Sequence, residues 1–180
     1  MRRVATTLRL AAALIALGGL AQQPAKAADL DSLAKRVQVL EDREEIRALI
    51  LAYGQAHDHR DYKTFASLFA TNGEWVGGLG SAKGPDAIFA LMDKTIGHHP
   101  LPNGSGTVHL LTNDQIVIDG DQASAVTKWI YITPDDAKAP RLVFIGHYDV
   151  KFIRERGKWK FLRREAPVDI PIPGNPAASK

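Results

Sequence analysis

Two side chains in this sequence are suited to proton chemistry, Asp58 and His109. An aspartate that accepts a hydrogen bond from one imidazole nitrogen fixes the tautomer of the histidine and raises the basicity of its other nitrogen. Such a pair can remove a proton from carbon or activate a water molecule. Spacing in the sequence does not show that the two residues meet, so Asp58 as a helix cap and His109 as a hydrogen-bonded core histidine remain alternatives.

Three other polar residues are candidates for the same site. Tyr53 precedes Asp58 by five residues, which on an ideal helix separates them by about 140°, so they share a pocket only if it wraps around the helix end. Asn113 lies on the same face of a predicted strand as His109. Arg164 follows the last predicted strand. The alternatives are core packing for Tyr53 and a surface ion pair for Arg164.

Four aromatic residues are candidates to line a ligand pocket. Trp129 and Tyr131 alternate along one predicted strand and therefore share a face. Tyr148 lies on the face of the next strand that we expect to point inward, and Trp75 opens an earlier strand. An aromatic pair at this spacing is also typical of a plain core, so packing remains the alternative.

The histidine pairs His57-x-His59 and His98-His99 invite a zinc interpretation. No Glu or Cys stands at ligand spacing near either pair, and the HExxH motif is absent. We therefore expect no metal site and no cofactor. The chain contains no cysteine, which excludes a thiol nucleophile and disulfides.

The elements that must position these residues follow a simple order. Apolar residues at three- and four-residue steps predict a long helix over 28–59, and two shorter helices follow, the first capped by Asp61 and the second begun by Pro85. Four long strands come after residue 107. This order predicts an α+β fold, a cone-shaped α+β barrel with three N-terminal helices packed in a strongly curved antiparallel sheet around a small pocket.

The N-terminus predicts export. Residues 1–27 combine an Arg-rich start, an apolar run and an Ala-Lys-Ala pattern, the order of a cleaved signal peptide, with an uncleaved anchor as the alternative. We expect a domain over 28–166, an irregular tail over 167–180, and a periplasmic or secreted protein. Cleavage leaves 19 basic and 20 acidic side chains, which argues against a nucleic-acid partner. We expect no membrane partner after cleavage.

Several short motifs, taken together, resemble SnoaL-like proteins of the nuclear-transport-factor-2-like superfamily over about residues 41–166. They are Tyr53-x-x-x-x-Asp58-x-x-Asp61-Tyr62, Phe65-x-x-Leu68-Phe69, Gly84-Pro85-x-Ala87-Ile88, His109-x-x-x-Asn113, Ile118-x-Gly120-Asp121, Gly146-x-Tyr148-x-Val150 and Gly157-x-Trp159-x-Phe161-x-x-Arg164.

Within that superfamily, the catalytic pattern resembles those of scytalone dehydratase, bile-acid dehydratase and hexachlorocyclohexane dehydrochlorinase. The resemblance implies a catalytic Asp58–His109 dyad, a catalytic role for Tyr53 and an active-site role for Arg164. The second catalytic histidine of scytalone dehydratase has no counterpart, because Trp129 and Tyr131 occupy that region.

We therefore expect an exported, cofactor-independent, dehydratase-like lyase whose dyad acts on a small apolar molecule, with cyclic molecules among the candidates. The alternatives are an isomerase or hydrolase that uses the same dyad, or a non-catalytic protein that binds a small hydrophobic ligand. Apolar side chains on the outer face of the sheet, including Val143, Ile145 and Ile153, predict a homo-oligomer, either a dimer or a trimer.

Overall fold

The computed structural model describes residues 24–101 and 106–170, and the chain divides into two units, Met1–Lys35 and Arg36–Lys180. The predicted signal peptide lies mostly outside the described residues, and helix α1 (Pro24–Asp58) begins just before its expected cleavage point. No helix among the described residues is both long and apolar enough to cross a membrane.

Helix α1 changes character along its length. Its later turns bury Ile46, Ile50 and Tyr53 in the core, as their three- and four-residue spacing predicts. The apolar residues nearer its start stay exposed, with Leu30 60% and Leu40 62% accessible. The apolar pattern of the sequence therefore predicts a longer buried face on α1 than the structure of the single chain shows.

One acidic side chain of α1 is buried. Asp42 accepts hydrogen bonds from Arg154 (2.5 Å), Gln38 (3.1 Å) and Trp159 (3.3 Å) and is 4% exposed. Burial raises the pKa of Asp42, but these hydrogen bonds outweigh it and leave the pKa below its usual value. This cluster ties α1 to the two last long strands.

The two shorter helices begin as the sequence predicts. Asp61 caps α2 (Tyr62–Ser67) by accepting a hydrogen bond from the backbone N–H of Thr64 at 3.1 Å. Helix α3 (Pro85–Thr95) has its proline in the first turn, where the missing N–H needs no partner. Its buried residues Ile88 and Met92 pack into the core.

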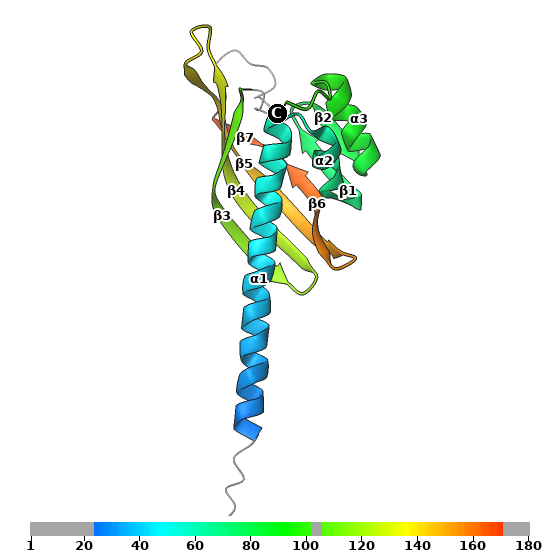
Figure 1. The fold of residues 1–180 in the computed structure, drawn as a ribbon, viewed down its shortest axis with the longest axis vertical. Helices are drawn as coiled ribbons and strands as arrows, with labels where there is room; N and C mark the ends of the chain where they lie inside the picture. The colour runs from blue at the N-terminus through cyan, green and yellow to red at the C-terminus, as the bar shows by residue number, and fades with distance from the viewer. Residues whose placement is uncertain (1–23, 102–105, 171–180) are drawn as a thin grey trace, which may run out of the picture. The chain divides into compact units, whose positions relative to one another are not determined.

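The sheet has the order β2-β1-β6-β5-β4-β3, with β7 paired to β5. Its strands are β1 (Phe69–Gly77), β2 (Gly80–Lys83), β3 (Val108–Asp119), β4 (Gln122–Pro134), β5 (Pro140–Glu155), β6 (Lys158–Glu165) and β7 (Val168–Ile170). The sheet curves around the later turns of α1, with α2 and α3 beside it (Figure 1). The predicted α+β class is confirmed.

Two details of the sheet differ from expectation. Strands β1 and β6 pair in parallel, so the sheet is mixed rather than wholly antiparallel. No hairpin joins these two strands, and therefore no tight turn dictates their relative direction. The tail, expected to be irregular from Pro167, instead begins with β7, which pairs with β5 at Ile145 and Gly146.

Gly146 explains how this pairing is possible. A Cβ at this position would lie 2.3 Å from the carbonyl oxygen of Pro167 and 2.5 Å from the ring of Trp129. Only glycine lets the Trp129 ring and the β7 segment approach the β5 backbone so closely.

Candidate active site

Asp58 and His109, which are 51 positions apart in the sequence, meet in the structure. The Oδ1 atom of Asp58 lies 2.6 Å from Nδ1 of His109, and the backbone N–H of His109 donates to Oδ2 at 2.9 Å. Both side chains are largely buried, with 16% and 9% of their surfaces exposed. When Nδ1 carries the proton toward the carboxylate, the Nε2 atom of a neutral ring is free to accept one.

The local backbone explains why Asp58 occupies this position. Helix α1 ends there because Arg60 adopts a left-handed conformation with φ of +55° and the Asp61 N–H closes the last turn onto the Ala56 carbonyl at 2.8 Å. The segment between α3 and β3 is held to the same helix end, since the N–H of Leu101 donates to the carbonyl of His59 at 2.9 Å. Strand β3 then begins at Val108 and presents His109 to the carboxylate.

Two rings flank the imidazole of His109. The ring centroid of His57 lies 4.5 Å away and that of Tyr131 lies 4.7 Å away. Burial lowers the pKa of His57 to about 3, with the nearby His109 as the next largest cause. His57 is therefore neutral at physiological pH, and only one of the two adjacent histidines is a candidate to carry charge.

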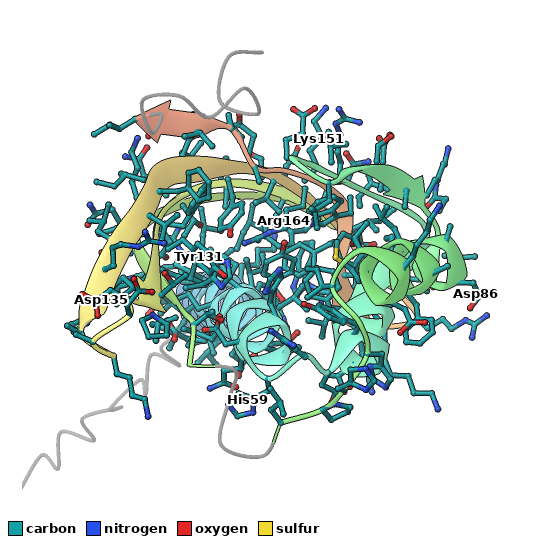
Figure 2. The ribbon with its side chains drawn as sticks, turned by 90° about the horizontal axis from the view of Figure 1, so that it is seen from above. His59, Asp86, Tyr131, Asp135, Lys151 and Arg164 are labelled. Carbon is teal, nitrogen blue, oxygen red and sulfur yellow. The ribbon has the colours of Figure 1, made fainter. Side chains whose placement is uncertain are left out.

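Arg164 is fully buried, contrary to the surface ion pair that is usual for an arginine. Within the part of the chain that the structure describes, its Nε, Nη1 and Nη2 atoms have no hydrogen-bond partner. Its guanidinium carbon lies 3.6 Å from the ring centroids of both Tyr53 and Tyr148, which form a cation–π sandwich. Figure 2 shows Arg164 in the interior, between the sheet and α1.

Tyr53 belongs to this arginine cluster rather than to the dyad. Its hydroxyl oxygen accepts a hydrogen bond from Nε1 of Trp75 at 2.9 Å, and the Trp75 side chain is buried. The hydroxyl hydrogen of Tyr53 remains available for donation. Phe65 packs between the arginine cluster and the histidines beside the dyad. Its ring centroid lies 4.5 Å from that of Tyr53 and 5.7 Å from that of His57.

The aromatic residues predicted to line a pocket form a second connection between Arg164 and His109. Tyr148 stacks on Trp129 with centroids 5.5 Å apart, and Trp129 donates from Nε1 to the carbonyl of His147 at 2.9 Å. Phe144 lies 6.4 Å from Trp129 and 6.3 Å from Tyr131, again measured between centroids. An unbroken set of rings therefore leads from Arg164 to His109.

Asn113 does not belong to this site. A β-bulge interrupts β3 between Thr112 and Gln115, and Asn113 adopts a positive φ of 56° within it. The bulge breaks the simple alternation of the strand, so sharing a face with His109 in the sequence pattern does not bring Asn113 inward. The side chain is exposed and contacts Thr112.

Two interior residues, His57 and Tyr62, are not among the predicted site residues. The position of His57 on the last turn of α1, beside Asp58, is a sequence signal that points to it. The hydroxyl of Tyr62 is buried without a partner among the described residues, and burial raises its pKa to about 12. The ring of Tyr62 packs edge-on against His57, with centroids 5.6 Å apart.

Three hollows of about 470, 100 and 410 Å³ lie elsewhere on the described residues. The largest is on the outer face of the sheet around Val126 and Arg163, and the smallest lies between α1 and β3 near Thr127. None of the three is lined by Asp58, His109 or Arg164. The expected small pocket at the dyad therefore does not correspond to any of them.

Comparison with known proteins identifies relatives of this fold. The family model described as SnoaL-like domain matches residues 38–165. None of the curated proteins matches the chain. A crystal structure of an NTF2-like protein with a cystatin-like fold from Novosphingobium aromaticivorans is 30% identical, with a TM-score of 0.68 over 83% of this chain and 94% of that chain.

Two more structures from the same organism share the fold at lower identity. One carries the provisional name scytalone dehydratase and is 21% identical, with a TM-score of 0.59 over 73% of this chain and 86% of that chain. The other carries the provisional name aromatic ring hydroxylase and is 23% identical, with a TM-score of 0.61 over 78% of this chain and 98% of that chain.

Proposed function

The chain belongs to the SnoaL-like domain family, and we propose that it is a cofactor-independent lyase in which His109, oriented by Asp58, removes a proton from a carbon atom. The observation that carries this proposal is the two-point contact of Asp58 with the ring and the backbone of His109, at 2.6 and 2.9 Å. The scytalone dehydratase name of one fold relative is consistent with a lyase.

The proposed step is an elimination. Nε2 of His109 takes a proton from a carbon next to an electron-withdrawing group. The electron pair of that C–H bond forms the new double bond, while the leaving group departs with its own bonding pair and then receives the proton. The imidazolium is stabilised by the Asp58 carboxylate and by the C-terminal end of α1, whose partial charge is negative.

The buried guanidinium of Arg164 supports a substrate that develops or carries negative charge. Its three unpartnered nitrogens offer hydrogen bonds to an oxyanion, a carboxylate or a departing anion. Arg164 lies within electrostatic range of the dyad, since its charge contributes to the lowered pKa of His57. Tyr53, which stacks on Arg164, would donate a further hydrogen bond.

The surrounding rings define the remainder of the proposed substrate. Tyr131, Trp129 and Tyr148 form an apolar surface between His109 and Arg164. We infer from these side chains a small, largely apolar substrate, with flat or cyclic molecules the best suited to an aromatic surrounding. We propose that the protein acts on such a molecule in the periplasm or outside the cell, as its N-terminal sequence predicts.

A second candidate function is non-catalytic binding of a small hydrophobic ligand. The observation in its favour is that the dyad lies outside the three hollows and is largely buried. An isomerase or a hydrolase would use the same dyad, returning the proton to another carbon atom or activating water.

The test compares dyad variants on a panel of cyclic β-hydroxy ketones and β-hydroxy acids, with elimination followed by ultraviolet absorption of the conjugated product. Asp58→Asn and His109→Gln should each lower turnover by about 100-fold or more. The double variant should lose little beyond either single variant, because the two residues act as a unit. Tyr53→Phe should cost less.

His59→Gln is the matched control, since His59 is exposed and adjacent to the dyad in sequence. Circular dichroism checks that every variant folds. If both dyad variants fold and retain near-normal turnover, the dyad is structural, and a ligand recovered by native mass spectrometry would then favour the binding protein.

A further inference from the structure

A buried ring nitrogen of His57 is left without a partner beside the dyad. Nδ1 of His57 is inaccessible to solvent and makes no hydrogen bond to any other described residue. Leaving a buried polar atom unsatisfied costs about 1–3 kcal/mol, so such an atom calls for an explanation. The mechanism proposed above gives His57 no task.

Three potential metal ligands converge at this point. His57, Asp58 and His109 each offer one ligand atom, and these three atoms lie within 4.8 Å of one another. Two imidazoles and one carboxylate form a donor set that suits zinc and other first-row transition metals. In tetrahedral zinc sites, metal–ligand bonds of about 2.0–2.1 Å place ligand atoms about 3.4 Å apart. The three ligand atoms, which lie within 4.8 Å of one another, would move to that spacing when a metal ion binds.

We propose that His57, Asp58 and His109 form a binding site for one divalent transition-metal ion, zinc in the first instance, with the fourth position open to water. The sequence argued against zinc because no third ligand stood near the His57-x-His59 pair. The fold supplies that ligand from β3, 52 positions after His57. His59 is exposed and is not one of the three converging residues.

The metal and the dyad proton compete for the same atoms. In the metal-free arrangement a hydrogen bond of 2.6 Å joins Asp58 to His109, and a metal bound to both residues replaces it. A coordinated His109 has no free role as a general base, so zinc inhibits the proposed elimination. The nearby Arg164 charge opposes a second cation, so the affinity should be lower than that of closed zinc sites built from thiolates.

Metal binding is measured directly, without a substrate. Protein without a histidine tag is stripped with a chelator and equilibrated by dialysis against Zn²⁺, and bound metal is counted by mass spectrometry. Co²⁺ is the second probe, because its visible absorption reports coordination by protein ligands. One metal ion per chain is the expected result, with a Co²⁺ band that excess Zn²⁺ removes.

His57→Gln should weaken Zn²⁺ binding at least about tenfold, since it removes a ligand outright. Asp58→Asn is a second variant that preserves shape, and it should weaken binding as well. His59→Gln and His99→Gln are matched controls that should leave binding unchanged. Equal Zn²⁺ affinity in the wild type and His57→Gln overturns the proposal, as does loss of binding in His59→Gln or His99→Gln alone. None of these results depends on turnover, so they are independent of the elimination test.

Discussion

Replacing Arg164 by Met should make the protein more stable and at the same time remove its affinity for anions. The three guanidinium nitrogens have no partner among the described residues, and each unsatisfied buried donor costs about 1–3 kcal/mol. The two cation–π contacts with Tyr53 and Tyr148 give back about 2 kcal/mol or somewhat more each, because the guanidinium is fully buried. A methionine fills a similar volume and keeps favourable sulfur–aromatic contacts.

We therefore expect Arg164→Met to raise the free energy of unfolding by about 1–4 kcal/mol, the range by which apolar replacement of buried ion pairs stabilises a protein. For a domain of this size, the melting temperature should rise by about 2–4 °C for each kcal/mol. Urea unfolding followed by tryptophan fluorescence measures the first quantity, and circular dichroism on heating measures the second.

Arg163→Met is the matched control, because Arg163 is its neighbour in sequence but forms partly exposed ion pairs with Glu74 and Glu165. Such pairs contribute about 0–1 kcal/mol, so this variant should be unchanged or slightly less stable. Benzoate should raise the melting temperature of the wild type and leave that of Arg164→Met unchanged. A loss of more than about 2 kcal/mol in Arg164→Met would refute the reasoning, since it would mean that the guanidinium has stabilising partners.

Four shorter predictions follow from other features. Gly146→Ala should lower the free energy of unfolding by about 1–3 kcal/mol, because its Cβ would collide with Trp129, whereas Gly78→Ala, with open space around it, should melt like the wild type. The lowered pKa of Asp42 stabilises the folded protein fully above the unfolded-state pKa of 3.8, and this stabilisation is lost as the pH falls through the lower folded-state pKa. The free energy of unfolding, measured across acid pH, should show this loss in the wild type and less of it in Asp42→Asn. Intact mass of exported protein should begin at Ala28, and uncleaved chain in the cytosol would contradict this. Light scattering at high micromolar concentration should show a dimer or trimer, and a monomer would rule out the predicted assembly.

The fold was largely predictable from local signals in the sequence. Asp61 and Pro85 marked two helix starts, and the alternating apolar residues of the long strands marked their inward faces. The parallel pairing of β1 with β6 was not predictable, because it joins segments with no turn between them. The exposed position of Asn113 was not predictable for a related reason, since a single extra residue in a strand changes which side chains face inward.

The candidate site was predictable in its parts but not in its arrangement. Residue types and their spacing in the sequence identified Asp58 and His109 as candidate residues for proton transfer, yet only the folded chain shows that the two side chains meet. Sequence offered no sign that Arg164 would be buried without an ion pair, because burial depends on which strands surround β6. His57 packs against residues of α2 and β3 rather than of its own helix, so its place beside Asp58 is the one sequence signal for it.

The double contact of Asp58 with His109 also makes the site a reporter of completed folding. One carboxylate holds both the backbone and the ring of a residue 51 positions away, so this contact closes a long loop and exists only after β3 has docked on α1. Contacts over such sequence separations carry a large loop-closure cost before they form. A chain in which β3 has not yet docked on α1 therefore lacks the contact that orients the His109 ring.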